Sequence, residues 1–166
     1  MKRLIGILTL VIFLAPSGLA QKFGHINSDE VLRAMPEFDT ASANLEKFRQ
    51  DLVNALELMT VELNNKSDAF NKESKSLTDI VRQTKEQELQ DMNRRIMEFQ
   101  QNAQEQLQNK QMELFQPVYA KVEQAIKDVG KENGFIYIFN VSALIYFDET
   151  KSINVLSLVK AKLGLK

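Results

Sequence analysis

The chain has 166 residues, a formal net charge of −1, a single histidine and no cysteine. The missing cysteines exclude disulfides, thiol catalysis and thiolate metal sites. The near-neutral charge argues against nucleic-acid binding, which normally needs a basic stripe on the surface.

The first twenty residues have the pattern of a secretory signal peptide. Lys2 and Arg3 precede an apolar run from Leu4 to Ala15, and small residues follow up to Ala20. The apolar run is too short for a comfortable membrane span, so we expect cleavage after about Ala20, export and no integral membrane insertion. An uncleaved membrane anchor is the alternative.

A short strand is expected next, because polar and apolar residues alternate from Gln21 to Asn27. Ser28 then offers an N-cap for a short helix through about Met35. Pro36 marks a joint in the chain.

The longest uniform stretch is Glu37 to Gln116, eighty consecutive residues without glycine or proline. Both residues weaken a helix interior, so this run favours helix. One helix of that length would span on the order of 120 Å, and the periodicity breaks near its middle, so a helical hairpin is expected. We place its tip near Ser74 to Thr78, where Ser76 or Thr78 could cap the second helix.

Both arms of the hairpin carry one apolar stripe at helical spacing. The first stripe runs from Leu45 to Leu77 and thins after Leu63; the second runs from Val81 to Leu114. Within the second arm, eight of the twelve residues from Gln100 to Gln111 are Gln or Asn, and we expect a polar helix there. The stripe residues form the seam between the helices, or some of them contact a bound polypeptide, and both can hold at different heights of the arm. The candidates for such contacts are Leu56, Met59, Leu63, Phe70, Met92, Ile96 and Phe99.

A helix packed on a sheet is expected after Pro117, because residues 118 to 129 present a wide apolar face. Gly134, or Gly130, would end it in the left-handed conformation. The apolar runs Phe135 to Phe139 and Leu144 to Phe147 predict a β-hairpin covered on both faces, by a helix and by another subunit. Ser152 is expected to cap a final helix.

The sequence shows no catalytic constellation. His25, the sole histidine, lies in a predicted strand without histidine or cysteine partners, so we interpret it as structural. Phosphate-binding glycine loops, nucleophile elbows and zinc motifs are absent from the sequence. We therefore expect neither an enzyme nor a cofactor.

These parts together resemble the OmpH/Skp family of periplasmic chaperones. The resemblance is carried by the strand and turn from Lys22 to Leu32, by Met35-Pro36, by the charged hairpin, and by Ala125 to Gly134 leading into apolar strands. It covers the whole mature chain. Known members are strongly basic, whereas this chain is slightly acidic, so electrostatic contact with lipid is not expected to be prominent.

The resemblance implies an α+β fold in which a homotrimer forms a small β-barrel-like body with long helical tentacles around a cavity. Such proteins hold unfolded outer-membrane proteins without ATP. On this chain it implies a signal peptide at 1–20, a body of 21–36 and 117–166, and an arm at 37–116. The residues expected in the trimer body are Phe23, Ile26, Phe135, Tyr137, Phe139, Ile145 and Phe147. A structural coiled-coil envelope protein that binds a folded partner, or acts as a spacer, is the alternative.

Overall fold

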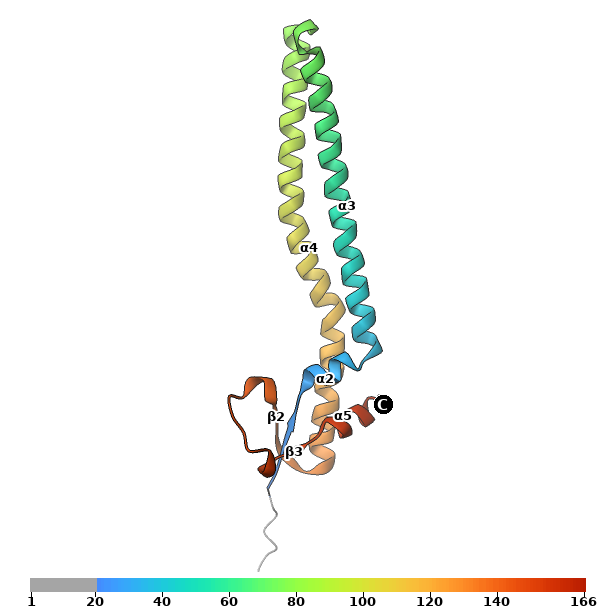
Figure 1. Cartoon of the computed structure of the whole chain (residues 1–166), viewed down its shortest axis with the longest axis vertical. Coiled ribbons are helices and arrows are strands. Elements are labelled where there is room, and N and C mark those ends of the chain that lie inside the picture. The colour runs from blue at the N-terminus through green and yellow to red at the C-terminus, as the bar shows by residue number, and fades with distance from the viewer. Residues whose placement is uncertain (1–20) are drawn as a thin grey trace, which may run out of the picture. The chain divides into compact units, whose positions relative to one another are not determined.

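The computed structural model describes residues 21–166, so the predicted signal peptide lies outside the described residues. The chain divides into two compact units. One unit contains the described residues up to Val31 together with Gln124–Lys166, and the other is Leu32–Glu123. The first holds a small sheet and the second a long helical hairpin (Figure 1), which confirms the predicted α+β class.

The hairpin consists of α3 (Pro36–Glu73) and α4 (Asp79–Asn133), which run side by side (Figure 1). Pro36 occupies the first turn of α3, where its missing N–H costs nothing. The tip is the 3₁₀ turn η1 (Ser74–Ser76), and the Thr78 hydroxyl accepts a 3.5 Å hydrogen bond from the Val81 amide. The predicted tip and its threonine cap are confirmed.

Pro117 does not end a helix, because α4 continues through it to Asn133. Proline removes one backbone hydrogen bond inside a helix and crowds the preceding turn. Val118 and Val122, directly after it, are both buried, and their packing offsets that cost. The glutamine-rich tract from Gln100 to Gln111 is helical throughout, as predicted.

Burial along the hairpin is graded. Side chains at its open end are fully buried, namely Leu32, Met35, Ala41, Phe115, Val118 and Val122. The rings of Phe38 and Phe115 meet edge to face there, with centroids 5.2 Å apart. From residue 42 to residue 114, by contrast, no side chain of this described stretch is fully buried. Two helices alone shield only one stripe each, so the outer hairpin has a seam but no core.

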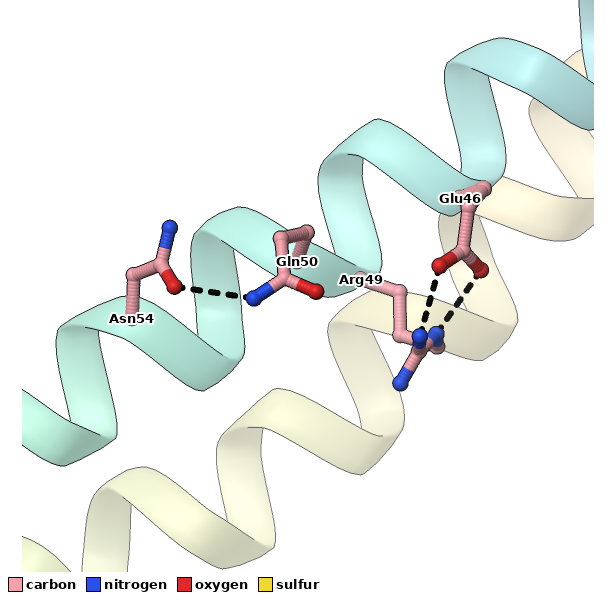
Figure 2. Close-up of polar contacts among 4 residues, drawn as sticks. All are labelled: Glu46, Arg49, Gln50 and Asn54. Carbon is pink, nitrogen blue, oxygen red and sulfur yellow. Dashed lines mark hydrogen bonds and ion pairs between the residues drawn. The ribbon is translucent and has the colours of Figure 1, made fainter.

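Ion pairs between the two helices supplement the seam. Lys66 of α3 pairs with Glu88 of α4, and Lys85 pairs with Glu73 at 3.2 Å between Nζ and Oε2. The hydrogen bond from Lys66, followed by its charge, holds the pKa of Glu88 below its ordinary value. A comparable pair lies within α3, where Arg49 donates two hydrogen bonds to Glu46 (Figure 2) and lowers the pKa of that carboxylate.

The sheet has three strands in the order β2-β1-β3, and both pairings are parallel. The strands are β1 (Lys22–Ile26), β2 (Phe135–Asn140) and β3 (Ile153–Asn154). The predicted β-hairpin is therefore wrong: residues 144–147 form no strand, and the partner of β1 on its second side is the short β3.

Two side-chain caps explain why the chain leaves the sheet after β2. The Asn140 carbonyl accepts a hydrogen bond from the Ser142 amide at 3.3 Å and starts the 3₁₀ turn η2 (Val141–Ala143). Asp148 does the same for the Thr150 amide at 2.9 Å and starts η3 (Glu149–Lys151). A run with high strand propensity between two such turns stays in a loop.

The two faces of the sheet have different surroundings. On one face Gly24 lies so close to Ile138, Val155 and Phe135 that an added Cβ would meet their side-chain carbons at 3.1, 3.2 and 3.3 Å. On the other face the rings of Phe23 and Tyr137 stack at 6.1 Å, and those of Tyr137 and Phe139 at 5.7 Å. A methyl group on Gly130 of α4 would meet Ile138 at 3.4 Å, so a helix covers the first face as expected. The aromatic row on the other face is exposed within one chain, as Tyr137 and Phe139 show.

Asparagine side chains, rather than the predicted serines, accept hydrogen bonds from amides in the first turns of two helices. Asn27 accepts from the Asp29 amide at 3.1 Å at the start of α2 (Ser28–Arg33), so Ser28 is not the N-cap. Asn154 accepts from the Leu156 amide at 2.9 Å at the start of α5 (Leu156–Lys162), whereas the Ser152 hydroxyl bonds His25. An amide oxygen reaches two residues forward more readily than a hydroxyl does.

A glycine follows the end of each of two helices. Gly134 has φ +68° directly after α4, and Gly164 has φ +72° after α5. Only glycine adopts this left-handed conformation without strain. The predicted C-cap at Gly134 is confirmed.

The close packing at Gly24 predicts that Gly24→Ala lowers the free energy of unfolding by about 1–3 kcal/mol, because three core side chains must move to admit one methyl group. Urea unfolding followed by circular dichroism measures this change. Gly130→Ala is the matched control, since its methyl group would meet only Ile138 at an ordinary 3.4 Å inside a helix. That variant is expected to be unchanged or stabilised by up to about 1 kcal/mol. Equal losses in the two variants would contradict this packing.

The ion pair between Lys66 and Glu88 predicts a pKa change in a variant. Its stabilisation is present above the unfolded pKa of Glu88 and is lost as the pH falls through the lower, folded pKa. We expect Lys66→Met to raise the pKa of Glu88 toward its ordinary value, as followed by carbon-detected NMR titration. Arg49→Met should raise the pKa of Glu46 and leave that of Glu88 unchanged. The pairing would be contradicted if the pKa of Glu88 were the same in Lys66→Met as in the wild type.

Candidate functional site

The candidate site is the surface of the hairpin, because it is the largest element without a core of its own. The seven stripe residues predicted as polypeptide contacts all come to the seam between α3 and α4, and each is half-buried. Five of them line grooves that open between the two helices: Leu56, Met59, Phe70, Met92 and Ile96. Leu63 and Phe99 lie in the seam and line none of these grooves. The stripe is thus both a packing surface and, where the helices part, an accessible one.

The first groove has a volume of about 630 Å³ and lies toward the tip. Met59, Met92 and Ile96 supply its apolar lining. Its rim is charged: Glu62, Lys66, Glu88, Asp91 and Arg95 all line it. Lys66 bridges this rim, since it pairs with Glu88 across the helices and with Glu62 at 3.6 Å along α3. An apolar group that enters the groove would therefore lie beside charged side chains, and Lys66 partly neutralises two of these, Glu62 and Glu88.

A second groove of about 320 Å³ is lined by other positions of the same two helices. Leu52 and Leu56 of α3 face Ala103 and Leu107 of α4 across it. Arg49 lies at its edge and is held by Glu46, while Gln50 donates a 2.9 Å hydrogen bond to Asn54 further along α3 (Figure 2). Alanine at position 103 leaves space that a larger residue would fill.

Three strongly exposed apolar side chains of the hairpin lie outside the predicted stripe, and one of them, Ile80, lines the first groove. Leu58 is 71% exposed, Ile80 79% and Met97 62%. The sequence pattern could have identified them, because at 3.6 residues per turn none of the three is in phase with the apolar stripe of its helix. Single exposed apolar residues are ordinary on protein surfaces, so they carry weight only as a distributed set.

The residues predicted for the trimer body divide into three groups. Ile26 is fully buried, and Phe147 packs on the His25 ring with centroids 4.8 Å apart, so both support the fold of one chain. Phe23 and Phe135 are half-buried. Three others present large surfaces to solvent: Tyr137 is 57% exposed, Phe139 42% and Ile145 completely.

His25 has structural surroundings. Its ring is buried, and Nδ1 shares a 2.9 Å hydrogen bond with the Ser152 hydroxyl. This bond ties the loop after β2 back to β1. Within residues 21–166 no group of three or more histidine, cysteine or acidic side chains could hold a metal ion. The helices of this part of the chain also include none that is long and apolar enough to cross a membrane.

Comparison with known proteins gives the family. A crystal structure described as an OmpH-like outer membrane chaperone from Caulobacter crescentus CB15 superimposes with a TM-score of 0.74. It shares 14% sequence identity with this chain, and the match covers 86% of this chain and 83% of that one, which shows a common fold. A search of curated proteins finds no significant match. The family model for outer membrane proteins of the OmpH-like type matches residues 22–163, and the chain therefore belongs to the OmpH-like family.

Proposed function

We propose that this protein is an ATP-independent holdase of the periplasm, which binds unfolded outer-membrane proteins between helical arms and prevents their aggregation. The main observation in support of the proposal is that no side chain from residue 42 to residue 114 is fully buried. A helical arm of that length without a fully buried side chain has little use as a rigid support. Its family membership and the OmpH-like chaperone of the same fold support the same conclusion.

A holdase needs many weak contacts that exchange quickly. The arm supplies them as half-buried Leu, Met and Phe in its grooves, separated by glutamine and by charged pairs. Full burial of one such side chain is worth only about 1.5–3 kcal/mol, so no single contact traps a client. Several arms acting together would convert these contacts into tight retention through avidity. Nucleotide chemistry is not required for this cycle.

Assembly into a trimer would place several arms around one client. The open aromatic row of Phe23, Tyr137 and Phe139 supports such an assembly, together with the exposed Ile145 and Tyr146 of the loop. These side chains form an apolar surface on a small unit, and a small unit commonly completes its core by oligomerisation. The surface suits a second and third copy of the same unit.

The holdase proposal predicts that residues 21–166 suppress aggregation of a urea-denatured outer-membrane β-barrel protein upon dilution. Light scattering should fall to near zero at about one trimer per client and should not respond to added ATP. Lysozyme at equal mass concentration serves as the control for crowding. Undiminished scattering at a severalfold excess of this protein would contradict the proposal.

The assembly proposal predicts a trimer in multi-angle light scattering, and Ile145→Asp should shift the population toward monomer because it buries a charge in the interface. Ile80→Asp is the matched control, since Ile80 is equally apolar and 79% exposed but lies on the hairpin. It should leave the mass unchanged. A wild-type monomer, or equal dissociation of both variants, would argue against this surface as the interface.

A further inference from the structure

One further groove differs from those between the two helices because one helix alone forms it. It has a volume of about 640 Å³ and lies along α4 near the open end of the hairpin. Met112, Phe115 and Tyr119 provide its apolar lining, and Gln108, Gln111 and Gln116 provide amide groups. Met112 is 53% exposed and Tyr119 49%, whereas Phe115 is buried beneath them.

The apolar lining is held in place by a chain of ring contacts. Tyr119 stacks on Phe115 with centroids 6.1 Å apart, and Phe115 meets Phe38 of α3 edge to face. Phe115 is fixed in the buried end of the hairpin, so Tyr119 presents its ring from a rigid support. A preorganised aromatic surface loses little conformational entropy when it binds, and that favours affinity.

The charge of the groove restricts what can occupy it. Among its lining residues only Glu123, at one end, carries charge at neutral pH, whereas the first groove has five charged side chains on its rim. The amides of Gln108, Gln111 and Gln116 each offer two hydrogen-bond donors and one acceptor. This neutral mixture matches the unpaired backbone N–H and C=O groups of an unfolded chain and rejects charged side chains.

The length of the apolar part argues against a helix from a second copy. Met112 and Tyr119 are two helical turns apart, roughly 10 Å; the polar Gln108 and Glu105 precede them on the same line, and Glu123 closes the groove at its other end. Helix pairs of the coiled-coil type need an apolar stripe sustained over several heptads. Roughly 10 Å corresponds instead to about three residues of extended chain, whose alternate side chains point to one face.

We propose that this groove is the principal site at which the arm grips an unfolded client, by taking one or two apolar side chains of a short extended segment. The three glutamines bond the backbone of that segment while Met112 and Tyr119 enclose its side chains. The inference rests on the proposed holdase function and assigns its main contact outside the seam stripe.

Site-specific photo-crosslinking on residues 21–166 tests the assignment. A benzophenone amino acid is placed at position 119, or at position 97 as the control. Met97 is an exposed methionine of the same helix that lines none of the three grooves. Irradiation with a denatured outer-membrane β-barrel protein should give about fivefold more client adduct from position 119. Adducts between copies of this protein that persist when client is added would show that a second copy covers the groove, and would overturn the proposal.

Binding of the same client to three variants completes the test. Met112→Ser combined with Tyr119→Ser should weaken binding about tenfold, as expected when two anchor side chains are lost. Tyr119→Phe should retain wild-type binding, and Met97→Ser should change it less than about twofold. Circular dichroism confirms that each variant remains helical. Wild-type affinity in the double variant would overturn the groove while leaving the holdase function intact, whereas absence of client binding by the wild type would remove the function itself.

Discussion

The structure of the arm depends on how little apolar surface two helices can hide from water. Each helix of a hairpin shields one stripe, and the seam from residue 42 to residue 114 is half-buried throughout. Stability is therefore concentrated at the open end, where Met35, Ala41 and Phe115 are buried, and it declines toward the tip. Regions with few buried contacts open locally at lower cost than the whole molecule unfolds. The arm is thus firm at one end and compliant at the other, and this gradient follows from its two-helix construction.

The ion pairs between the helices add some stability to the outer half of the hairpin, but its open end remains the more stable part. Lys66 with Glu88 and Lys85 with Glu73 lie in the outer half, where Phe70 and Leu89 are the main seam residues. Exposed pairs of this kind contribute little individually and are screened by salt. They fix the register of the two helices against sliding, which a short apolar seam alone would do poorly. A binding arm benefits from that combination, because its surfaces stay aligned while its outer part remains easy to open.

Long-range periodicity made the hairpin predictable, and local side-chain caps made the sheet unpredictable. The run without glycine or proline predicted helix, and the break in its periodicity together with the possible caps Ser76 and Thr78 placed the tip at Ser74 to Thr78. In the other unit, asparagine or aspartate accepts from the amide two residues ahead at four places: Asn27, Asn140, Asp148 and Asn154. Two of these caps start helices that were assigned to neighbouring serines, and two create the loop that had been interpreted as a strand. Apolar patterning cannot reveal them, although Asx-turn chemistry could have.

In the candidate site, too, features set by the sequence of one helix were predictable, whereas features that need both helices were not. The residues of the seam stripe follow from the helical spacing within each helix, so they could be predicted one by one. The groove beside Tyr119 could not, because it depends on Phe38 supporting Phe115 from the other helix. Which Phe or Tyr is buried and which is exposed depends on the register between α3 and α4, and the sequence of α4 alone does not reveal that register. A seam residue that contacts a client is partly covered by the other helix, whereas about half of the Met112 and Tyr119 surface is exposed before any client arrives. For a protein that must bind clients without an energy source, contacts through side chains that are already exposed require less free energy from the arm.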